Sequence, residues 1–104
     1  SQFQGDGTFY NPGVGTGSCG QLHQDSELVV ALNKQQYGDM ANPNLAEVCG
    51  KQVEIKGPKG SVRATIVDTC PVVGCGYGSL DLSPAAFEKI ADFDTGRVPI
   101  QWSF

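Results

Sequence analysis

The sequence lacks any apolar run of the length that a membrane span requires, about 18 residues or more. It also lacks a cluster of basic residues, because its seven Lys and Arg are scattered and its formal net charge is -4. An acidic chain without a basic stripe is poorly suited to a phosphate backbone or an anionic membrane surface. We therefore expect no nucleic acid and no membrane among its partners, and a neutral glycan or a protein instead.

Metal-binding patterns are missing as well. The chain has one His and no pair of cysteines at the C-x-x-C spacing of a zinc knuckle. Its four cysteines form an even set in a short chain, which is typical of structural disulfides in an oxidising compartment. We therefore expect no metal, no cofactor, and a secreted, extracellular protein. Spacing alone does not choose among the possible pairings; we predict Cys19 with Cys49 and Cys70 with Cys75.

Turn-forming residues are abundant, with 14 glycines and six prolines among 104 residues. So many turn formers suit numerous short strands better than a few long helices. A chain of this length has room for one hydrophobic core. We therefore expect a single all-β domain over residues 1–104. The start at Ser1, without an initiator Met or a signal-like segment, indicates a mature, processed product.

Apolar residues follow strand periodicity in several short segments. The continuously apolar run 28–32 predicts a strand buried on both faces. Residues 53–55 alternate with polar neighbours, and the turn 57–60 joins this half-buried strand to a second one in a hairpin. Ser83 followed by Pro84 predicts a capped helix start. We further expect a β segment from Gly5, a helical turn over 33–37, a loop over 38–47, and strands at 80–82 and 98–104.

Two aspartates occupy distinctive places in this pattern. Strict period-two alternation puts Asp68 on the inward-tending face of its strand, at the strand's end. Because Leu80 and Leu82 face the core together, Asp81 between them turns to the opposite side. By themselves, both carboxylates could simply cap turns or strand ends.

Three other residues are left out of the candidate site. His23 lies in a polar segment, where a lone His is more often solvated than catalytic. Trp102 alternates with apolar positions and is expected in the core. Arg97 is expected to pair with Asp92 or Asp94 at the surface.

Two segments carry a family resemblance: Ile-Val-Asp-Thr-Cys-Pro at 66–71 and Leu-Asp-Leu-Ser-Pro-Ala-Ala-Phe at 80–87. They resemble the double-psi β-barrel core of expansins, rare-lipoprotein-A-like proteins and barwin-like proteins. The likeness extends to residues 7–10, 18–20 and 96–102. It is closest to single-domain loosenins, which lack the second, carbohydrate-binding domain of expansins. The resemblance implies a six-stranded double-psi β-barrel with one or two short helices.

The resemblance also implies an open groove lined by residues matching Thr8, Asp68 and Asp81. In expansins, such a groove contacts cell-wall glycan without hydrolysing it. The expansin pattern has an aromatic residue shortly after the first aspartate, where this chain has Thr69 and Cys70.

Tyrosines elsewhere in the chain are candidates to replace that aromatic residue. Their ring faces pack on sugars and their hydroxyls form hydrogen bonds at the ring edge. The candidates are Tyr10, Tyr37 and Tyr77, and we include Tyr10 and Tyr77 in the predicted groove.

We expect no enzymatic activity. The hydrolytic relatives in glycoside hydrolase family 45 carry their acid at the position of Asp81 and their base near the opening strand, after the aromatic. Here that neighbourhood is Tyr10-Asn11-Pro12, and Asn11 cannot act as a general base. If any lytic activity exists, Asp81 would be its acid, as in lytic transglycosylase relatives.

Two functions are consistent with these expectations. The first is a secreted, monomeric, expansin-like protein that binds and loosens cell-wall polysaccharide of the cellulose, chitin or peptidoglycan type without hydrolysis. The alternative is an inhibitor of papain-like cysteine proteases, because single-domain barrels similar to this one also act in that way. The glycine-rich loops 11–20 and 72–79 would then enter the protease cleft.

Overall fold

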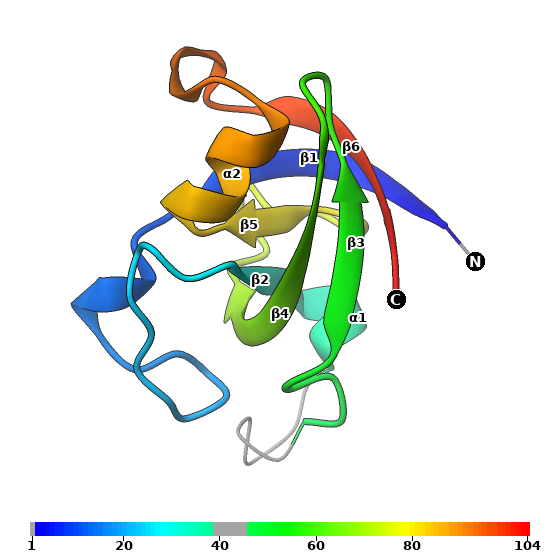
Figure 1. Ribbon diagram of the computed structural model, residues 1–104. Coiled ribbons are helices and arrows are strands. Elements are labelled where there is room, and N and C mark those ends of the chain that lie inside the picture. The colour runs from blue at the N-terminus through cyan, green and yellow to red at the C-terminus, as the bar shows by residue number, and fades with distance from the viewer. Residues whose placement is uncertain (1, 39–45) are drawn as a thin grey trace.

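The computed structural model describes residues 2–38 and 46–104, so most of the predicted loop 38–47 lies outside the described residues. Six strands close into a barrel in the order β1-β5-β2-β4-β3-β6 (Figure 1). This confirms the predicted six-stranded, all-β barrel. Within the described ranges, no helix is long and apolar enough to cross a membrane. The strands are β1 (Phe3–Phe9), β2 (Val29–Asn33), β3 (Gln52–Lys56), β4 (Ser61–Cys70), β5 (Leu80–Leu82) and β6 (Val98–Ser103).

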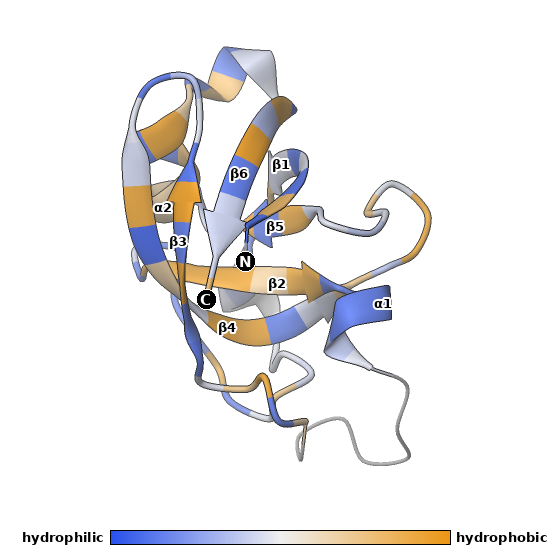
Figure 2. Ribbon diagram, turned by 90° about the vertical axis from the view of Figure 1, so that its right-hand side faces the viewer, coloured by the Kyte–Doolittle hydropathy of each residue, from blue (hydrophilic) through white to orange (hydrophobic). Residues whose placement is uncertain are grey.

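The strand pairing combines two parallel contacts with antiparallel ones. Strands β1 and β5 are parallel, as are β2 and β4, whereas the other neighbours in the barrel are antiparallel. The predicted hairpin is the β3–β4 pair. The residues of β3 and β6, and those of β4 as far as Ile66, alternate between buried and more exposed positions; Figure 2 colours these strands by hydropathy. The apolar set therefore faces the barrel interior.

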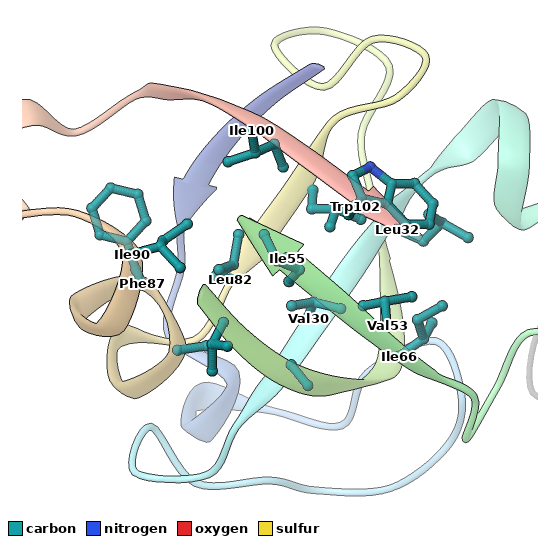
Figure 3. Packing of buried hydrophobic residues seen from close by; sticks show 14 of the residues in the cluster. Val30, Leu32, Val53, Ile55, Ile66, Leu82, Phe87, Ile90, Ile100 and Trp102 are labelled. Carbon is teal, nitrogen blue, oxygen red and sulfur yellow. The ribbon is translucent and has the colours of Figure 1, made fainter. Parts of the chain in front are cut away.

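The barrel interior holds one large apolar cluster, drawn in Figure 3. All five residues of β2 are buried, as the apolar run predicts for positions 29–32. Leu28, the first residue of the predicted strand, instead precedes β2 and is 38% exposed, and the buried polar Asn33 ends the strand. Trp102 is 1% exposed, which confirms its predicted place in the core. Its indole Nε1 donates a hydrogen bond of 2.8 Å to the carbonyl of Gly78. The ring is thereby tied to the loop before β5.

Both short helices follow a capping residue, and the cap at Ser83 was predicted. Helix α1 (Lys34–Tyr37) follows Asn33, whose side chain accepts a hydrogen bond from the N–H of Gln36. Helix α2 (Pro84–Ile90) follows Ser83, whose hydroxyl accepts from the N–H of Ala86. Helix α2 packs on the barrel through its buried apolar face. Two 3-10 turns, η1 (Pro12–Val14) and η3 (Phe93–Thr95), complete the elements of the described chain.

Strand β4 departs from strict alternation at Val67. Ile66 and Val67 are both buried, and the register with β2 shifts there, so that Val30 pairs with Ile66 and Ala31 with Asp68. A bulge residue reverses the face of the residues that come after it. The prediction that Asp68 shares the inward face of the strand is therefore wrong. The bulge turns Asp68 to the outside, beside Ala31.

Both disulfides have the predicted pairing. Cys19–Cys49 links positions 30 residues apart, which in the chain-entropy account contributes roughly 3 to 4 kcal/mol. The hydroxyl of Tyr37 lies 3.6 Å from Sγ of Cys19 and 3.4 Å from Sγ of Cys49. Cys70–Cys75 closes a tight loop directly after β4.

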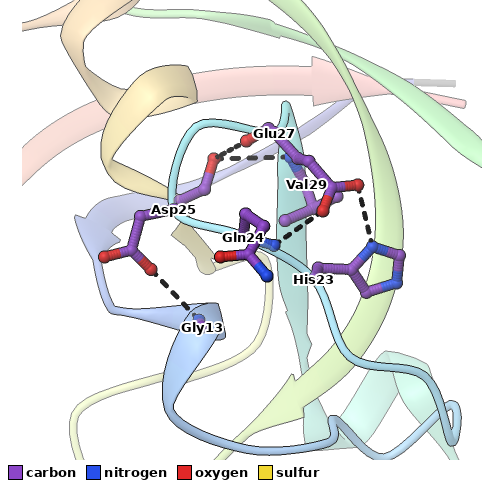
Figure 4. A network of polar contacts seen from close by, with 7 residues as sticks. Gly13, His23, Gln24, Asp25, Glu27 and Val29 are labelled. Carbon is purple, nitrogen blue, oxygen red and sulfur yellow. Dashed lines mark hydrogen bonds and ion pairs between the residues drawn. The ribbon is translucent and has the colours of Figure 1, made fainter.

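The long segment between β1 and β2 is held by polar contacts (Figure 4). Oδ1 of Asp25 accepts the N–H of Gly13 at 3.1 Å. The carboxylate of Glu27 accepts the N–H of Gln24 at 2.6 Å and lies 3.1 Å from Nδ1 of His23. The Gln24 N–H and the His23 ring lower the pKa of the Glu27 carboxyl. His23 thus takes part in shaping this loop.

Candidate functional site

Four outward-facing residues lie in one row on four neighbouring strands. Thr8 of β1 is the register partner of Asp81 of β5. Ala31 of β2 is the register partner of both Asp81 and Asp68. Figure 2 shows β5, β2 and β4 next to one another. Since neighbouring strands are about 4.8 Å apart, the row spans about 14 Å of barrel surface. We call these four residues the aspartate face.

Asp81 has the outward orientation that the sequence predicts. It is half-buried between the fully buried Leu80 and Leu82. The hydroxyl of Thr8 donates a hydrogen bond of 2.8 Å to its Oδ1. Burial raises the pKa of the Asp81 carboxyl, and the nearby Asp68 carboxylate raises it further, against the lowering effects of the Thr8 bond and the Arg97 charge. The Asp81 carboxyl thus keeps its proton to a higher pH than an exposed aspartate does.

Asp68 is held by the backbone. Its Oδ1 accepts two N–H bonds of 2.8 Å, one from Ser18 and one from Thr69. Gly17 lies so close that a Cβ at this position would contact the Asp68 side chain. The loop before β2 therefore closes over one oxygen of the carboxylate. Within residues 2–38 and 46–104, no hydrogen bond reaches the other oxygen, Oδ2.

The surface between the two aspartates is apolar. Ala31, Cys70 and Cys75 are buried together there, with Tyr10 packed against them. The disulfide and Tyr10 thus cover Ala31, the small residue in the middle of the aspartate face. The hydroxyl of Tyr10 is buried and has no hydrogen-bond partner among the described residues. Burial, followed by the charges of Asp68 and Asp81, raises the pKa of the Tyr10 phenol, which indicates that the phenol lies near both carboxylates.

The other two tyrosines differ in exposure. Tyr37 is 4% exposed and contacts the Cys19–Cys49 disulfide, so its ring is not available as a sugar platform. Tyr77 is 62% exposed, in the loop that leads to β5. The structure thus brings Thr8, Tyr10, Asp68 and Asp81 together and presents Tyr77 in the neighbouring loop.

Arg97 is a neighbour of this site that sequence reasoning missed. Its Nη1 donates to Oδ2 of Asp6 at 3.0 Å, and its Nη2 donates to the carbonyl of Gly74 at 2.8 Å. The expected pairing of Arg97 with Asp92 or Asp94 is therefore wrong; Asp92 instead contacts Lys59 at 3.1 Å. The partners come from β1 and the disulfide loop, and only the closed barrel brings these segments to Arg97.

The titration of Asp81 provides a test of this electrostatic arrangement. We expect the carboxyl of Asp81 to titrate above its ordinary range, and Arg97→Met to raise its midpoint further because a positive charge is lost. Carboxyl carbon NMR across an acid titration measures the midpoint directly. Lys59→Met, which removes a charge paired with Asp92, is the control. A midpoint that stays the same in Arg97→Met would show that Arg97 does not act on Asp81.

No group of three or more His, Cys, Asp or Glu side chains in the described part of the chain is arranged to hold a metal ion. The candidate site consists of two carboxylates and a hydroxyl around an apolar patch, against which the buried Tyr10 phenol packs. Such a set can accept hydrogen bonds from a ligand rich in hydroxyl groups.

Comparisons with known proteins identify a matching family and relatives that cover nearly the whole chain. Residues 2–102 match the protein family described as "Lytic transglycolase". The chain is 30% identical over 106 residues to an "EG45-like domain containing protein" of Citrus jambhiri, which covers 96% of this chain and 79% of that protein. The match therefore includes nearly all of the barrel.

Two solved structures are similar in both fold and sequence. A mutant Clavibacter michiganensis expansin in complex with cellohexaose superposes with a TM-score of 0.82 at 31% identity, over 99% of this chain and 50% of that one. The Streptomyces papain inhibitor superposes with a TM-score of 0.87 at 32% identity, over 99% of this chain and 93% of that one. The chain thus spans half the length of the expansin.

The family match and the relatives therefore lead to one conclusion: the chain belongs to the expansin-like double-psi β-barrel family.

Proposed function

We propose that this protein binds cell-wall polysaccharide on the aspartate face and loosens it without hydrolysis. The observation that carries the proposal is the row Thr8, Asp81, Ala31 and Asp68, in which two half-buried carboxylates flank a small residue. Each carboxylate has one oxygen engaged by the protein and a second that accepts no hydrogen bond from the described residues. These second oxygens are available to a ligand.

Charge-assisted hydrogen bonds are the strong ones, so two such acceptors would compete well for sugar hydroxyls. A polymer bound in this way exchanges some chain-to-chain hydrogen bonds for bonds to the protein. The exposed ring of Tyr77 adds an aromatic surface near the row. The expansin bound to cellohexaose has the same barrel, which supports a glycan ligand here.

The proposed absence of hydrolysis rests on the missing base. A glycosidase normally needs an acid and a second carboxylate that acts as base or nucleophile. Asp81 has the raised pKa of an acid. The neighbourhood where hydrolytic relatives carry the base is Tyr10-Asn11-Pro12 in this chain, and exposed Asn11 cannot act as a general base. If lytic activity were present, Asp81 would serve as its acid.

A pull-down and a mechanical assay test the proposal together. The protein should sediment with cellulose, chitin or peptidoglycan, and should weaken fibres of the polymer that it binds. Reducing ends in the supernatant should stay at the level of the buffer control. Failure to bind any of the three polymers would contradict the binding proposal, and a steady release of reducing ends would contradict the non-lytic one.

The cellular setting is part of the same proposal. Two disulfides favour an oxidising compartment, so we place the protein outside the cell. That the protein is a monomer with a single domain over residues 1–104 stays a prediction.

A second candidate function, inhibition of papain-like cysteine proteases, is favoured by one specific loop. Val72 and Val73 are 55% and 91% exposed. They lie between Cys70 and Cys75, whose disulfide is buried against Ala31. A rigid loop loses little entropy on binding, so an exposed apolar tip of this kind suits insertion into a cleft. The similarity to the Streptomyces papain inhibitor supports this candidate.

Val73→Asp tests the second candidate. If the loop enters a protease cleft, placing a charge at its tip should weaken papain inhibition by at least about tenfold, because central apolar contacts carry most of the binding energy. Inhibition constants with papain measure the effect. Leu22→Asp, which alters another exposed apolar side chain outside both candidate loops, is the control. No inhibition by the native protein at micromolar concentration would exclude papain as a target.

A further inference from the structure

A hollow of about 670 Å³ lies on the outer surface where β1, β6 and β3 meet. Its residues are different from those of the aspartate face, but both sets include residues of β1. Most of its lining residues are exposed, and glycine, proline and isoleucine lie there beside polar side chains, so it is an open surface feature rather than an internal cavity. We call it the β1–β6 hollow, and its main side chains are Gln4, Asp6, Lys56, Pro58, Pro99 and Gln101.

The register of three strands places long polar side chains side by side in this hollow. Gln4 of β1 is the partner of Gln101 of β6, and Gln101 is also the partner of Lys56 of β3. Gln101 is exposed between Ile100 and Trp102, which are buried. The row therefore points away from the core, and its three side chains are within reach of one another.

The hollow is continuous with the aspartate face along β1. Gln4, Asp6 and Thr8 alternate with inward positions, so they share the outer side of the strand, with about 7 Å between successive members. Arg97 connects the two regions. It binds Asp6 at 3.0 Å, and its charge lowers the pKa of the Asp81 carboxyl. A ligand leaving Asp81 along β1 would therefore meet Arg97 and Asp6 before it reached Gln4.

The chemistry of the hollow suits a neutral ligand with many hydroxyl groups. A Gln side chain offers both donors and an acceptor, and Lys56 offers donors. Sugar hydroxyls need both kinds of partner. The charge of Asp6 is balanced by Arg97, so the hollow is not strongly acidic. The rings of Pro58 and Pro99 provide apolar surface for the C–H faces of a sugar ring.

We propose that the β1–β6 hollow is a second subsite for the same polysaccharide chain that the aspartate face binds. The chain would run from Asp68 and Asp81 over Arg97 to Gln4 and Gln101. The inference rests on the proposed function and adds that affinity depends on the length of the oligosaccharide. Short oligosaccharides occupy only the aspartate face, and longer ones occupy both regions.

A comparison of short and long oligosaccharides tests the subsite. The probes are cellobiose and cellohexaose, with chitobiose and chitohexaose in parallel. The double variant Gln4→Ala/Gln101→Ala should bind the hexasaccharide about tenfold more weakly, because two hydrogen-bonding side chains are lost. Its affinity for the disaccharide should not change. Gln52→Ala, on the exposed side of β3 outside the hollow, is the matched control and should bind both as the native protein does.

NMR of the side-chain amides gives an independent readout. The amide signals of Gln4 and Gln101 should shift with hexasaccharide and stay in place with disaccharide. If the native protein binds neither length and none of the three polymers in the pull-down, the proposed function fails. If it binds hexasaccharide with shifts around Asp81, but the double variant binds equally well and the two amide signals do not move, the subsite alone is disproved.

Discussion

Asp81→Asn is expected to weaken binding to insoluble polysaccharide by at least about tenfold and to abolish fibre loosening. The variant keeps the size of the side chain and can still accept the Thr8 hydrogen bond. It loses the negative charge that strengthens hydrogen bonds from sugar hydroxyls, and bonds to charged groups are worth about 1.5 to 3 kcal/mol. Binding isotherms on the polymer that the native protein binds, together with fibre strength, measure the effect.

The same substitution should not destabilise the barrel. Because the pKa of Asp81 is raised in the folded protein, the folded state holds its proton to higher pH than the unfolded chain does. The stability contribution of this carboxyl therefore falls as pH rises through the raised pKa, and at pH 7 the ionised group disfavours folding. Asn removes that cost. Denaturant unfolding at pH 7 should therefore give a free energy at least equal to that of the native protein.

Asp94→Asn, on an exposed turn away from the aspartate face, is the matched control and should bind as the native protein does. Native-like binding by Asp81→Asn would remove Asp81 from the proposed site. Weak binding by an unfolded variant would be recognised in the unfolding experiment, because the expected result there is undiminished stability.

Gly78→Ala is expected to lower the free energy of unfolding by about 2 to 5 kcal/mol. The backbone of Gly78 has φ +85°, where a residue with a Cβ costs about 1 to 2 kcal/mol. A Cβ there would also overlap the backbone carbonyl of Gln4, and overpacking costs about 1 to 3 kcal/mol more. The carbonyl of Gly78 binds Trp102, so any shift would disturb the core. Urea unfolding followed by tryptophan fluorescence measures the loss.

Gly76→Ala is the control from the same loop. A Cβ at Gly76 would meet no atom within 4 Å, and its φ is not in the left-handed region. Its stability should therefore stay within about 0.5 kcal/mol of the native value, as surface substitutions usually do. Equal stability of the two alanine variants would show that the close contact between β1 and the loop before β5 does not constrain the fold.

Local patterns were enough to predict most elements of the barrel. Residues 29–32 of the apolar run lie in the buried strand β2, although exposed Leu28 does not, and Ser83 with Pro84 forms the capped start of α2. The outward orientation of Asp81 could also be predicted from its neighbours Leu80 and Leu82. These features depend on residues a few positions apart, where the periodicity of side-chain directions is strict.

The orientation of Asp68 could not be predicted in the same way. Alternation holds through Ile66, but the bulge at Val67 reverses the face of the later residues of the strand. Both Ile66 and Val67 are apolar, and both are buried, so the sequence contains no polar residue that would mark the irregularity. The bulge depends on how β4 aligns with β2, a strand that lies more than thirty residues earlier in the chain.

By itself, the sequence indicated the class of fold and which two aspartates to consider, whereas cysteine spacing left three disulfide pairings open, of which the structure has the predicted one. Only the tertiary structure decided that Asp68 and Asp81 are both register partners of Ala31, that Arg97 binds Asp6 and Gly74, and that Tyr10 packs against the cluster of Ala31 and the Cys70–Cys75 disulfide. The physical reason is how far apart the interacting residues lie along the chain. Strand and helix patterns arise from neighbours in the chain, whereas a binding surface is assembled from strands that meet only when the barrel closes.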